Sequence, residues 1–133
     1  MKIKQRLSVL FLLILSLLSC LIFPCCSKNE MIGTYKLYQI IENGKTYELG
    51  DEWDEKILTK DFYTLELYED ESFLMTSNGN DSFFVQGTWK QSENTLILTP
   101  APQYGNPMSF TYDKNQQTLT AVGDDFGTVL KKE

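Results

Sequence analysis

Two clusters of carboxylates are the densest groups of reactive side chains in this sequence. Glu69-Asp70-Glu71 forms one cluster, and Asp124-Asp125 forms the other. Paired carboxylates can act as the acid and base of a hydrolase, and carboxylate-rich loops bind calcium. Neither cluster has the ligand spacing of a calcium loop, and each lies where the flanking strand-like segments require a turn. We therefore interpret both as solvated turns, and we expect no catalytic residue and no metal site.

The chain contains no histidine. This excludes catalytic pairs of serine or cysteine with histidine, and it removes the commonest ligand of zinc, copper and nickel. The sequence also has no glycine-rich phosphate loop. It therefore predicts a protein that is not an enzyme and that needs no cofactor.

The N-terminus has the pattern of an export signal. A basic start at residues 1–6 precedes an apolar run at residues 7–18 that is too short to cross a bilayer. The run ends in Leu17-Leu18-Ser19-Cys20, which resembles the bacterial lipobox. The resemblance implies that the Cys20 thiol is lipidated and that the chain is cleaved before Cys20. It divides the N-terminus into a lipoprotein signal peptide at 1–19 and a lipidated cysteine with its tether at 20–32.

Two alternatives to lipidation at Cys20 stay open. Leu21-Ile22-Phe23 extends the apolar run, so the segment could remain as an uncleaved anchor, and Cys25 and Cys26 are other acceptors. Every alternative places the remaining chain on the extracytoplasmic face of the cell membrane. Because no cysteine follows Cys26, we expect no disulfide in the folded domain.

The charge of the chain indicates which partners to expect. The 12 basic and 18 acidic residues give a net charge of −6. Lys2, Lys4 and Arg6 precede the apolar run, so the exported part keeps nine basic residues and carries a charge of −9. Such a charge repels phosphate backbones and anionic headgroups. We expect no nucleic-acid partner, and we expect a monomer that a lipid anchor holds at the membrane.

Short strand-like segments alternate with turn signals from residue 33 onward, a pattern typical of an all-β barrel or sandwich. Asn43-Gly44 predicts a tight hairpin turn. The short turns predict antiparallel neighbours, and eight strands suffice to close a small barrel. We expect about eight strands, at residues 33–41, 63–69, 73–76, 83–90, 95–99, 108–112, 118–122 and 127–132.

Residues 51–60 break the strand pattern. Their acidic residues come first and their lysines last, and Trp53, Ile57 and Leu58 recur at helical spacing behind a capping Asp51. We predict one short helix here, after the first strand, with its apolar stripe closing one end of the barrel.

Two sequence motifs resemble those of lipocalin-like domains in bacterial lipoproteins. The stretch from Leu65 to Phe73 is similar to their LxLxxDGxF pattern. Gly87-Thr88-Trp89-Lys90, followed by residues 94–99, is similar to their GTW…NTLTLT element, and residues 127–132 look like their closing strand. The resemblance covers residues 33–133 and implies a calycin-type barrel. Glu71-Ser72 departs from the usual Asp-Gly, which requires a different turn.

Strand alternation predicts the side chains that point into the barrel. As a binding site they would form an apolar calyx for a lipid, a hydrophobic metabolite or an acyl chain. The alternative is a packed core, because an eight-stranded barrel is only just wide enough to be filled by its own side chains. The candidate ligand-binding residues are Tyr35, Leu65, Leu67, Phe73, Trp89, Leu96, Leu98, Phe110 and Tyr112, and Leu37, Val85 and Leu119 complete the inward set.

The sequence therefore predicts a membrane-anchored lipoprotein whose barrel binds a small apolar ligand or an envelope component. The alternative is a structural or protein-interaction module with a filled barrel. Exposed aromatic residues clustered on one side would favour that alternative. Phe84, Tyr68 and Tyr104 are the candidates for such a cluster.

Overall fold

The computed structural model describes residues 29–79 and 82–133. The predicted signal peptide at 1–19 and the predicted lipidation site at Cys20 lie outside the described residues. The described elements are β1 (Gly33–Glu42), β2 (Lys45–Glu48), β3 (Glu52–Trp53), β4 (Lys56–Ile57), the 3-10 turn η1 (Lys60–Phe62), β5 (Tyr63–Leu67), β6 (Ser72–Ser77), β7 (Phe83–Ser92), β8 (Thr95–Pro100), the 3-10 turn η2 (Pro102–Tyr104), β9 (Met108–Asp113), β10 (Thr118–Val122) and β11 (Phe126–Lys132).

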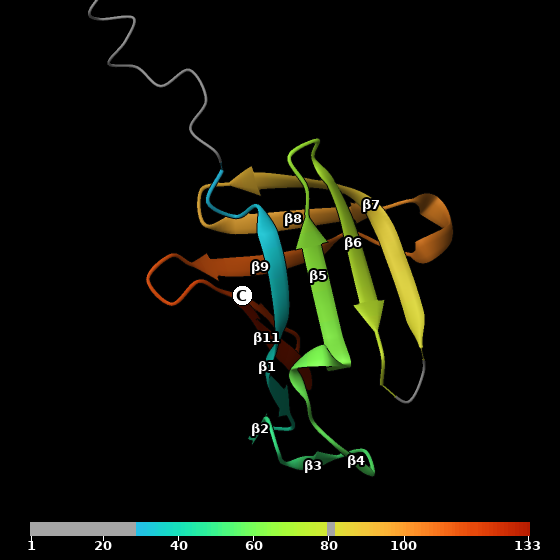
Figure 1. Ribbon diagram of the computed structural model, residues 1–133, viewed down its shortest axis with the longest axis vertical. Helices are drawn as coiled ribbons and strands as arrows, with labels where there is room; N and C mark the ends of the chain where they lie inside the picture. Colours follow the sequence, from blue (N-terminus) through green and yellow to red (C-terminus); the bar gives the residue numbers. More distant parts are fainter. Residues whose placement is uncertain (1–28, 80–81) are drawn as a thin grey trace, which may run out of the picture.

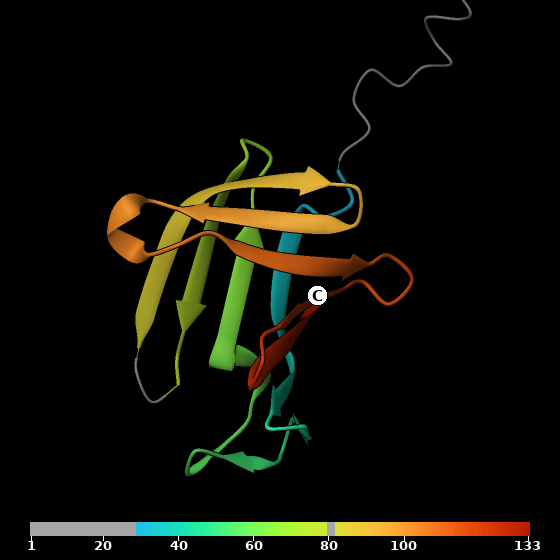
Figure 2. The ribbon, with the colours of Figure 1, turned by 180° about the vertical axis from the view of Figure 1, so that it is seen from behind.

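Eight strands close into an antiparallel barrel (Figure 1). β5 to β11 follow one another around the sheet in chain order, and β1 completes the ring because it pairs with both β5 and β11. Figure 2 shows β9, β10 and β11 from behind, on the far side of the barrel from β5 and β6. The predicted all-β fold, with a small antiparallel barrel of about eight strands, is confirmed.

β1 has three partners because it is long and irregular. Gly33–Lys36 pair with β5, whereas Gln39–Glu42 pair with β2. Along its other edge, Tyr35 to Glu42 pair with β11, and a bulge shifts the register between Leu37 and Gln39. Bulges bend a strand and increase its twist. The predicted Asn43-Gly44 turn joins β1 to β2 with φ values of 50° and 77°, as a type I′ hairpin requires.

The inward side chains pack into one apolar core. Of the twelve residues that alternation placed inside, eleven are buried and Val85 is partly buried. The core also contains five apolar residues outside that set: Met31, Ile40, Leu58, Phe62 and Leu130.

One end of the barrel is covered by residues 29–32, which belong to the predicted tether. Met31 is fully buried, and the Tyr35 hydroxyl donates a hydrogen bond of 2.8 Å to its carbonyl. The Lys132 ammonium donates to the Glu30 carbonyl at 2.6 Å, which ties this segment to the last strand. The chain therefore enters the barrel at a covered end.

The predicted helix at residues 51–60 is wrong. The segment forms the β3–β4 hairpin, in which Trp53 pairs with Lys56, and only η1 after it is helical. Asp54 and Glu55 adopt positive φ values of 50° and 65°, the combination of a type I′ turn, without glycine. The helical spacing places Ile57 on the buried apolar stripe, but its side chain is 58% exposed. Trp53 instead packs edge-on against Phe62, with ring centroids 5.7 Å apart.

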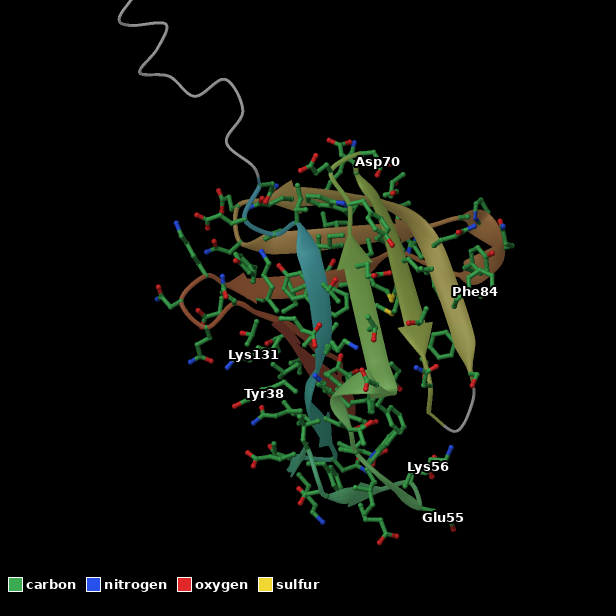
Figure 3. All side chains as sticks on the ribbon, viewed as in Figure 1. Tyr38, Glu55, Lys56, Asp70, Phe84 and Lys131 are labelled. Atoms are coloured by element: carbon green, nitrogen blue, oxygen red, sulfur yellow. The ribbon has the colours of Figure 1, made fainter. Side chains whose placement is uncertain are left out.

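The β3–β4 hairpin lies at the far end of the molecule from the β5–β6 turn. Figure 3 shows Glu55 and Lys56 at one extreme and Asp70 at the other. Leu58, which follows the hairpin, is buried in the core. Trp53 of the hairpin and Leu58 after it thus pack against the barrel, whereas Ile57 does not.

In the β5–β6 turn, Asp70 stands at the aspartate position of the LxLxxDGxF pattern and Glu71 stands at the glycine position, so the departure is at Glu71 and not at the pair Glu71-Ser72. Glu71 has a φ of 66°, the left-handed conformation that glycine adopts without strain. Its carbonyl accepts a 2.8 Å hydrogen bond from the Trp89 amide, so the neighbouring strand β7 holds this conformation in place. The Asp70 carboxylate accepts hydrogen bonds from the Ser72 hydroxyl and, at 3.0 Å, from the Ser72 amide, and these bonds lower the pKa of the Asp70 carboxyl.

We expect Glu71→Gly to raise the free energy of unfolding by about 0.5–1 kcal/mol, because it removes left-handed strain that exceeds the entropic cost of glycine. Urea unfolding of the full-length protein measures this change. Glu71→Ala is the control: it removes the carboxylate but keeps the strain, and so it should give no gain. A glycine variant no more stable than the alanine variant would contradict this account.

Candidate functional site

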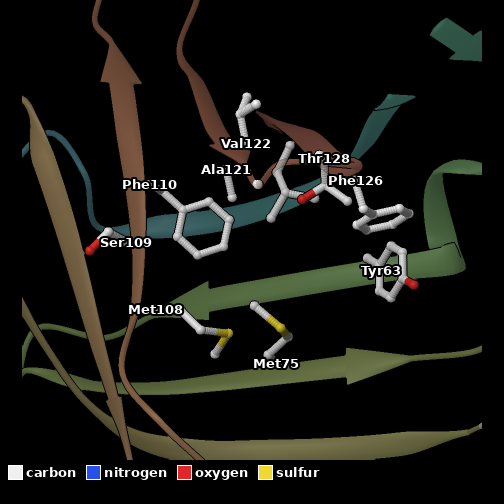
Figure 4. Close-up of a pocket in the computed structure, with 12 residues that line it drawn as sticks. Tyr63, Met75, Met108, Ser109, Phe110, Ala121, Val122, Phe126 and Thr128 are labelled. Carbon is white, nitrogen blue, oxygen red and sulfur yellow. The ribbon is translucent and has the colours of Figure 1, made fainter. Parts of the chain in front are cut away.

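An apolar cavity of about 370 Å³ lies inside the barrel (Figure 4). Its walls come from five strands that surround it. The side chains that form most of the lining are Tyr63 of β5, Met75 of β6, Met108 and Phe110 of β9, Ala121 of β10, and Phe126 and Thr128 of β11. The volume lies in the range of small-molecule sites, which are concave and mostly apolar.

The cavity exists because β9 and β10 separate. Their pairing ends at Thr111 with Thr120. Beyond that pair, Ser109 and Phe110 line one side of the cavity, and Ala121 and Val122 line another. Strand pairing keeps a barrel wall closed, so the interior is open where the β9–β10 pairing ends.

A second ladder ends on another side of the barrel. β7 pairs with β6 from Phe83 onward, but its pairing with β8 begins only at Gly87. The side chain of Phe83 lies on the same face of β7 as that of the buried Trp89, yet it is 45% exposed. The interior at this end of the barrel is therefore reached by solvent.

The predicted ligand-binding residues divide between the two halves of the barrel. Phe110 alone among them lines the described cavity. The other eight are buried in the core: Tyr35, Leu65, Leu67, Phe73, Trp89, Leu96, Leu98 and Tyr112. The barrel is thus packed where the sequence placed the calyx, and it is hollow where the strands separate.

Trp89 lies in the packed half, and its surroundings explain the Gly-Thr-Trp element. Its indole N–H donates a 3.0 Å hydrogen bond to the Tyr68 carbonyl, which fixes the ring beneath the β5–β6 turn. A Cβ on Gly87 would come within 2.1 Å of the Thr99 carbonyl oxygen and 3.0 Å of the Phe73 ring. The glycine therefore permits close approach of backbone and ring, a structural role.

Sequence reasoning missed several lining residues, although strand alternation indicates that some of them point inward. Tyr63 and Met75 have the strand parity of the buried Leu65 and Phe73. Alternation therefore points both side chains inward, as Figure 4 shows. Phe126 has the strand parity of Thr128 and the buried Leu130, but it lies just before the strand predicted at 127–132.

Hydroxyl groups provide polarity in the cavity. Figure 4 shows the Thr128 oxygen among apolar side chains. Tyr63 also lines the cavity, and burial raises the pKa of its phenol above the ordinary value. Tyr63 is therefore neutral at physiological pH. Together these groups can donate or accept hydrogen bonds, but they cannot neutralise a charge.

Aromatic rings border the cavity near the β3–β4 hairpin. Phe126 lies 6.0 Å from Trp53, and Tyr63 lies 5.3 Å from Phe62, measured between ring centroids. The Trp53 indole N–H donates to a Glu42 carboxylate oxygen at 2.9 Å, which holds the ring in place. Phe126 is nevertheless 41% exposed. The rim is therefore apolar and accessible.

The two carboxylate clusters lie at opposite ends of the barrel. Residues 69–71 form the β5–β6 turn, whereas Asp124 and Asp125 form the β10–β11 turn beside the cavity. Within residues 29–79 and 82–133, no group of three acidic, histidine or cysteine side chains could hold a metal ion.

The three aromatic candidates for an interaction surface do not form one patch. Phe84 contacts Tyr104 of η2, with ring centroids 5.6 Å apart. Tyr68 lies at the β5–β6 turn, whereas Phe84 pairs with Thr76 near the other end of β6. The expected cluster is therefore reduced to the pair of Phe84 and Tyr104.

Two solved structures share this fold. A crystal structure of a lipocalin-like protein from Bacteroides uniformis covers 79% of this chain and all of its own, with a TM-score of 0.54 and 9% identity. An uncharacterized protein from Bacteroides eggerthii covers 78% of this chain and all of its own, with a TM-score of 0.51 and 12% identity. The barrel is therefore lipocalin-like in fold, as the sequence resemblance implied.

Comparison with protein-family profiles gives no match, and comparison with curated proteins gives none either. In the described part of the chain, no helix has the length and apolar character needed to cross a membrane.

Proposed function

We propose that this protein is a lipid-anchored extracytoplasmic binding module, not an enzyme, and that its barrel takes up a small apolar ligand. The observation that carries the ligand proposal is the cavity of about 370 Å³ and its mostly apolar lining. A fully packed barrel would leave no such space in its interior. The proposed ligand site lies where β9 and β10 separate, and not in the core that the sequence suggested.

The positions of the covered end and of the cavity rim, at opposite ends of the barrel, support this function. Gly33, at the start of β1, adjoins the covered end, where Met31 is buried. Glu42, at the other end of β1, pairs with Phe126 on the cavity rim. An anchor at Cys20 would therefore join the barrel at the end away from the cavity. The protein would present its cavity away from the membrane to which it is attached.

A protein-interaction role is the second candidate, and one observation favours it. Phe84 is 53% exposed and contacts Tyr104 on the outer face of the barrel. Residues 83–85 of β7 also lack a β8 partner in the strand register, whereas the Gln86 carbonyl accepts a 2.9 Å hydrogen bond from the Ala101 amide just after β8. An unpaired strand edge with exposed aromatic residues can accept a strand from another protein. The cavity supports the ligand role more directly, because five strands of the barrel supply its apolar walls.

We expect Ala121→Trp to abolish ligand binding, because the indole would occupy the cavity. The full-length protein in phosphatidylcholine nanodiscs is titrated with the neutral fluorescent probe N-phenyl-1-naphthylamine. Wild type should show saturable binding, and the variant should bind at least about ten-fold more weakly, as loss of most apolar contact predicts.

Ala101→Trp is the matched control, because Ala101 lies outside the cavity lining, next to η2. It should bind like wild type. Near-ultraviolet circular dichroism checks that both variants are folded. Equal binding by wild type and Ala121→Trp would refute the cavity as the ligand site.

The anchor is tested by metabolic labelling with radioactive palmitate in a bacterial host. We expect Cys20→Ala to lose the label and to leave the membrane fraction, because two or more acyl chains are needed for stable anchoring. Cys25→Ala and Cys26→Ala are matched controls and should retain the label. Persistent labelling of Cys20→Ala would move the anchor to a later cysteine.

A further inference from the structure

We propose that the cavity selects uncharged apolar ligands and rejects anions of the fatty-acid type. This inference rests on the proposed function, since it names the chemical class that the same cavity accepts. It follows from two features of the structure: the chemistry of the lining, and the charge of the turn that borders the mouth.

The lining offers nothing to balance an ionised headgroup. No lysine, aspartate or glutamate is among the lining residues of the described cavity. Moving an unpaired carboxylate into apolar surroundings is strongly unfavourable, whereas a hydroxyl or carbonyl needs only one hydrogen-bond partner. The Thr128 hydroxyl can supply that partner (Figure 4). The interior therefore favours an alcohol, ester or ketone over a carboxylate.

The β10–β11 turn places negative charge at the mouth. Asp124 and Asp125 lie between Gly123 and Phe126, both of which line the cavity. The Gly123 amide donates a 2.7 Å hydrogen bond to the Phe126 carbonyl, and the Asn43 amide donates a 2.9 Å bond to the Asp125 carbonyl. These backbone bonds hold the turn beside the opening. Two exposed carboxylates there repel an approaching anion.

Lysines near this turn and on the barrel wall have other partners. Lys45, which follows the Asn43-Gly44 turn, lies over the Tyr47 ring, 4.6 Å from its centroid. Among the described residues, Lys36 pairs with Asp61, Lys60 with Glu133, and Lys114 with Glu30, and no lysine forms an ion pair with Asp124 or Asp125. Lys131 lies over the Tyr38 ring, 5.1 Å from its centroid, on the outer face of the barrel.

Lys56 also has a hydrogen-bond partner within the fold. It belongs to the β3–β4 hairpin, whose Trp53 contacts the rim residue Phe126. Its ammonium donates a 3.2 Å hydrogen bond to the Gly79 carbonyl beyond the end of β6. The hairpin also carries Glu52, Asp54 and Glu55, so Lys56 does not make this part of the rim cationic.

The test compares ligands that share one chain and differ in the headgroup. Decan-1-ol and decanoate compete with N-phenyl-1-naphthylamine for the full-length protein in phosphatidylcholine nanodiscs, near neutral pH, where decanoate is ionised. The Ala121→Trp protein in identical nanodiscs gives the background from partition into lipid. We expect decan-1-ol to displace the probe at an about ten-fold lower concentration than decanoate.

Two variants separate the contributions to this preference. Asp124→Asn/Asp125→Asn removes the charge at the mouth with little change of shape, and it should reduce the preference without abolishing it. Lys56→Gln should leave the preference unchanged.

The outcomes distinguish this inference from the proposed function. If the probe binds wild type no better than Ala121→Trp, the proposed function fails. If the probe binds but decanoate competes as well as decan-1-ol, the inference alone is overturned. Decanoate binding that Lys56→Gln abolishes would overturn it as well. A preference unchanged in the double asparagine variant would refute the part assigned to the carboxylates.

Discussion

The pairing of β1 with β11 closes the barrel, and the rest of the structure depends on it. It runs from Tyr35 with Lys132 to Glu42 with Phe126, so it joins the first and last strands along most of their length. Closure removes two sheet edges that would otherwise be free, and it turns one face of each strand inward. The core therefore draws on strands from both ends of the chain, including Tyr35 and Leu130.

The same constraint explains why a cavity forms at one end of the barrel. A closed wall requires each strand to pair with two neighbours, and the β9–β10 ladder stops at Thr111 and Thr120. Side chains of the packed half interdigitate, whereas those beyond the last pair lose their neighbours across the gap. Phe110 lies at the boundary, because it is buried in the core and also lines the cavity.

Much of the fold could be predicted from sequence because it depends on local signals. Strand alternation identified the inward face, and Asn43-Gly44 identified a hairpin turn. The β3–β4 hairpin was missed because its turn has Glu55 where a type I′ turn usually has glycine, and because acidic residues that precede lysines are typical of a helix. The cavity could not be predicted, because it depends on where the pairing of β9 with β10 ends. That register is a long-range property, and no motif of either strand reports it.

The hollow half of this barrel is the proposed ligand site. Native mass spectrometry of the full-length protein, released gently from nanodiscs, tests it most directly. The account predicts a non-covalent adduct of an uncharged apolar molecule on wild type that is absent from Ala121→Trp. An adduct-free mass for wild type that persists after incubation with decan-1-ol would contradict the claim. The pair of Phe84 and Tyr104 would then be the surface on which to seek a partner.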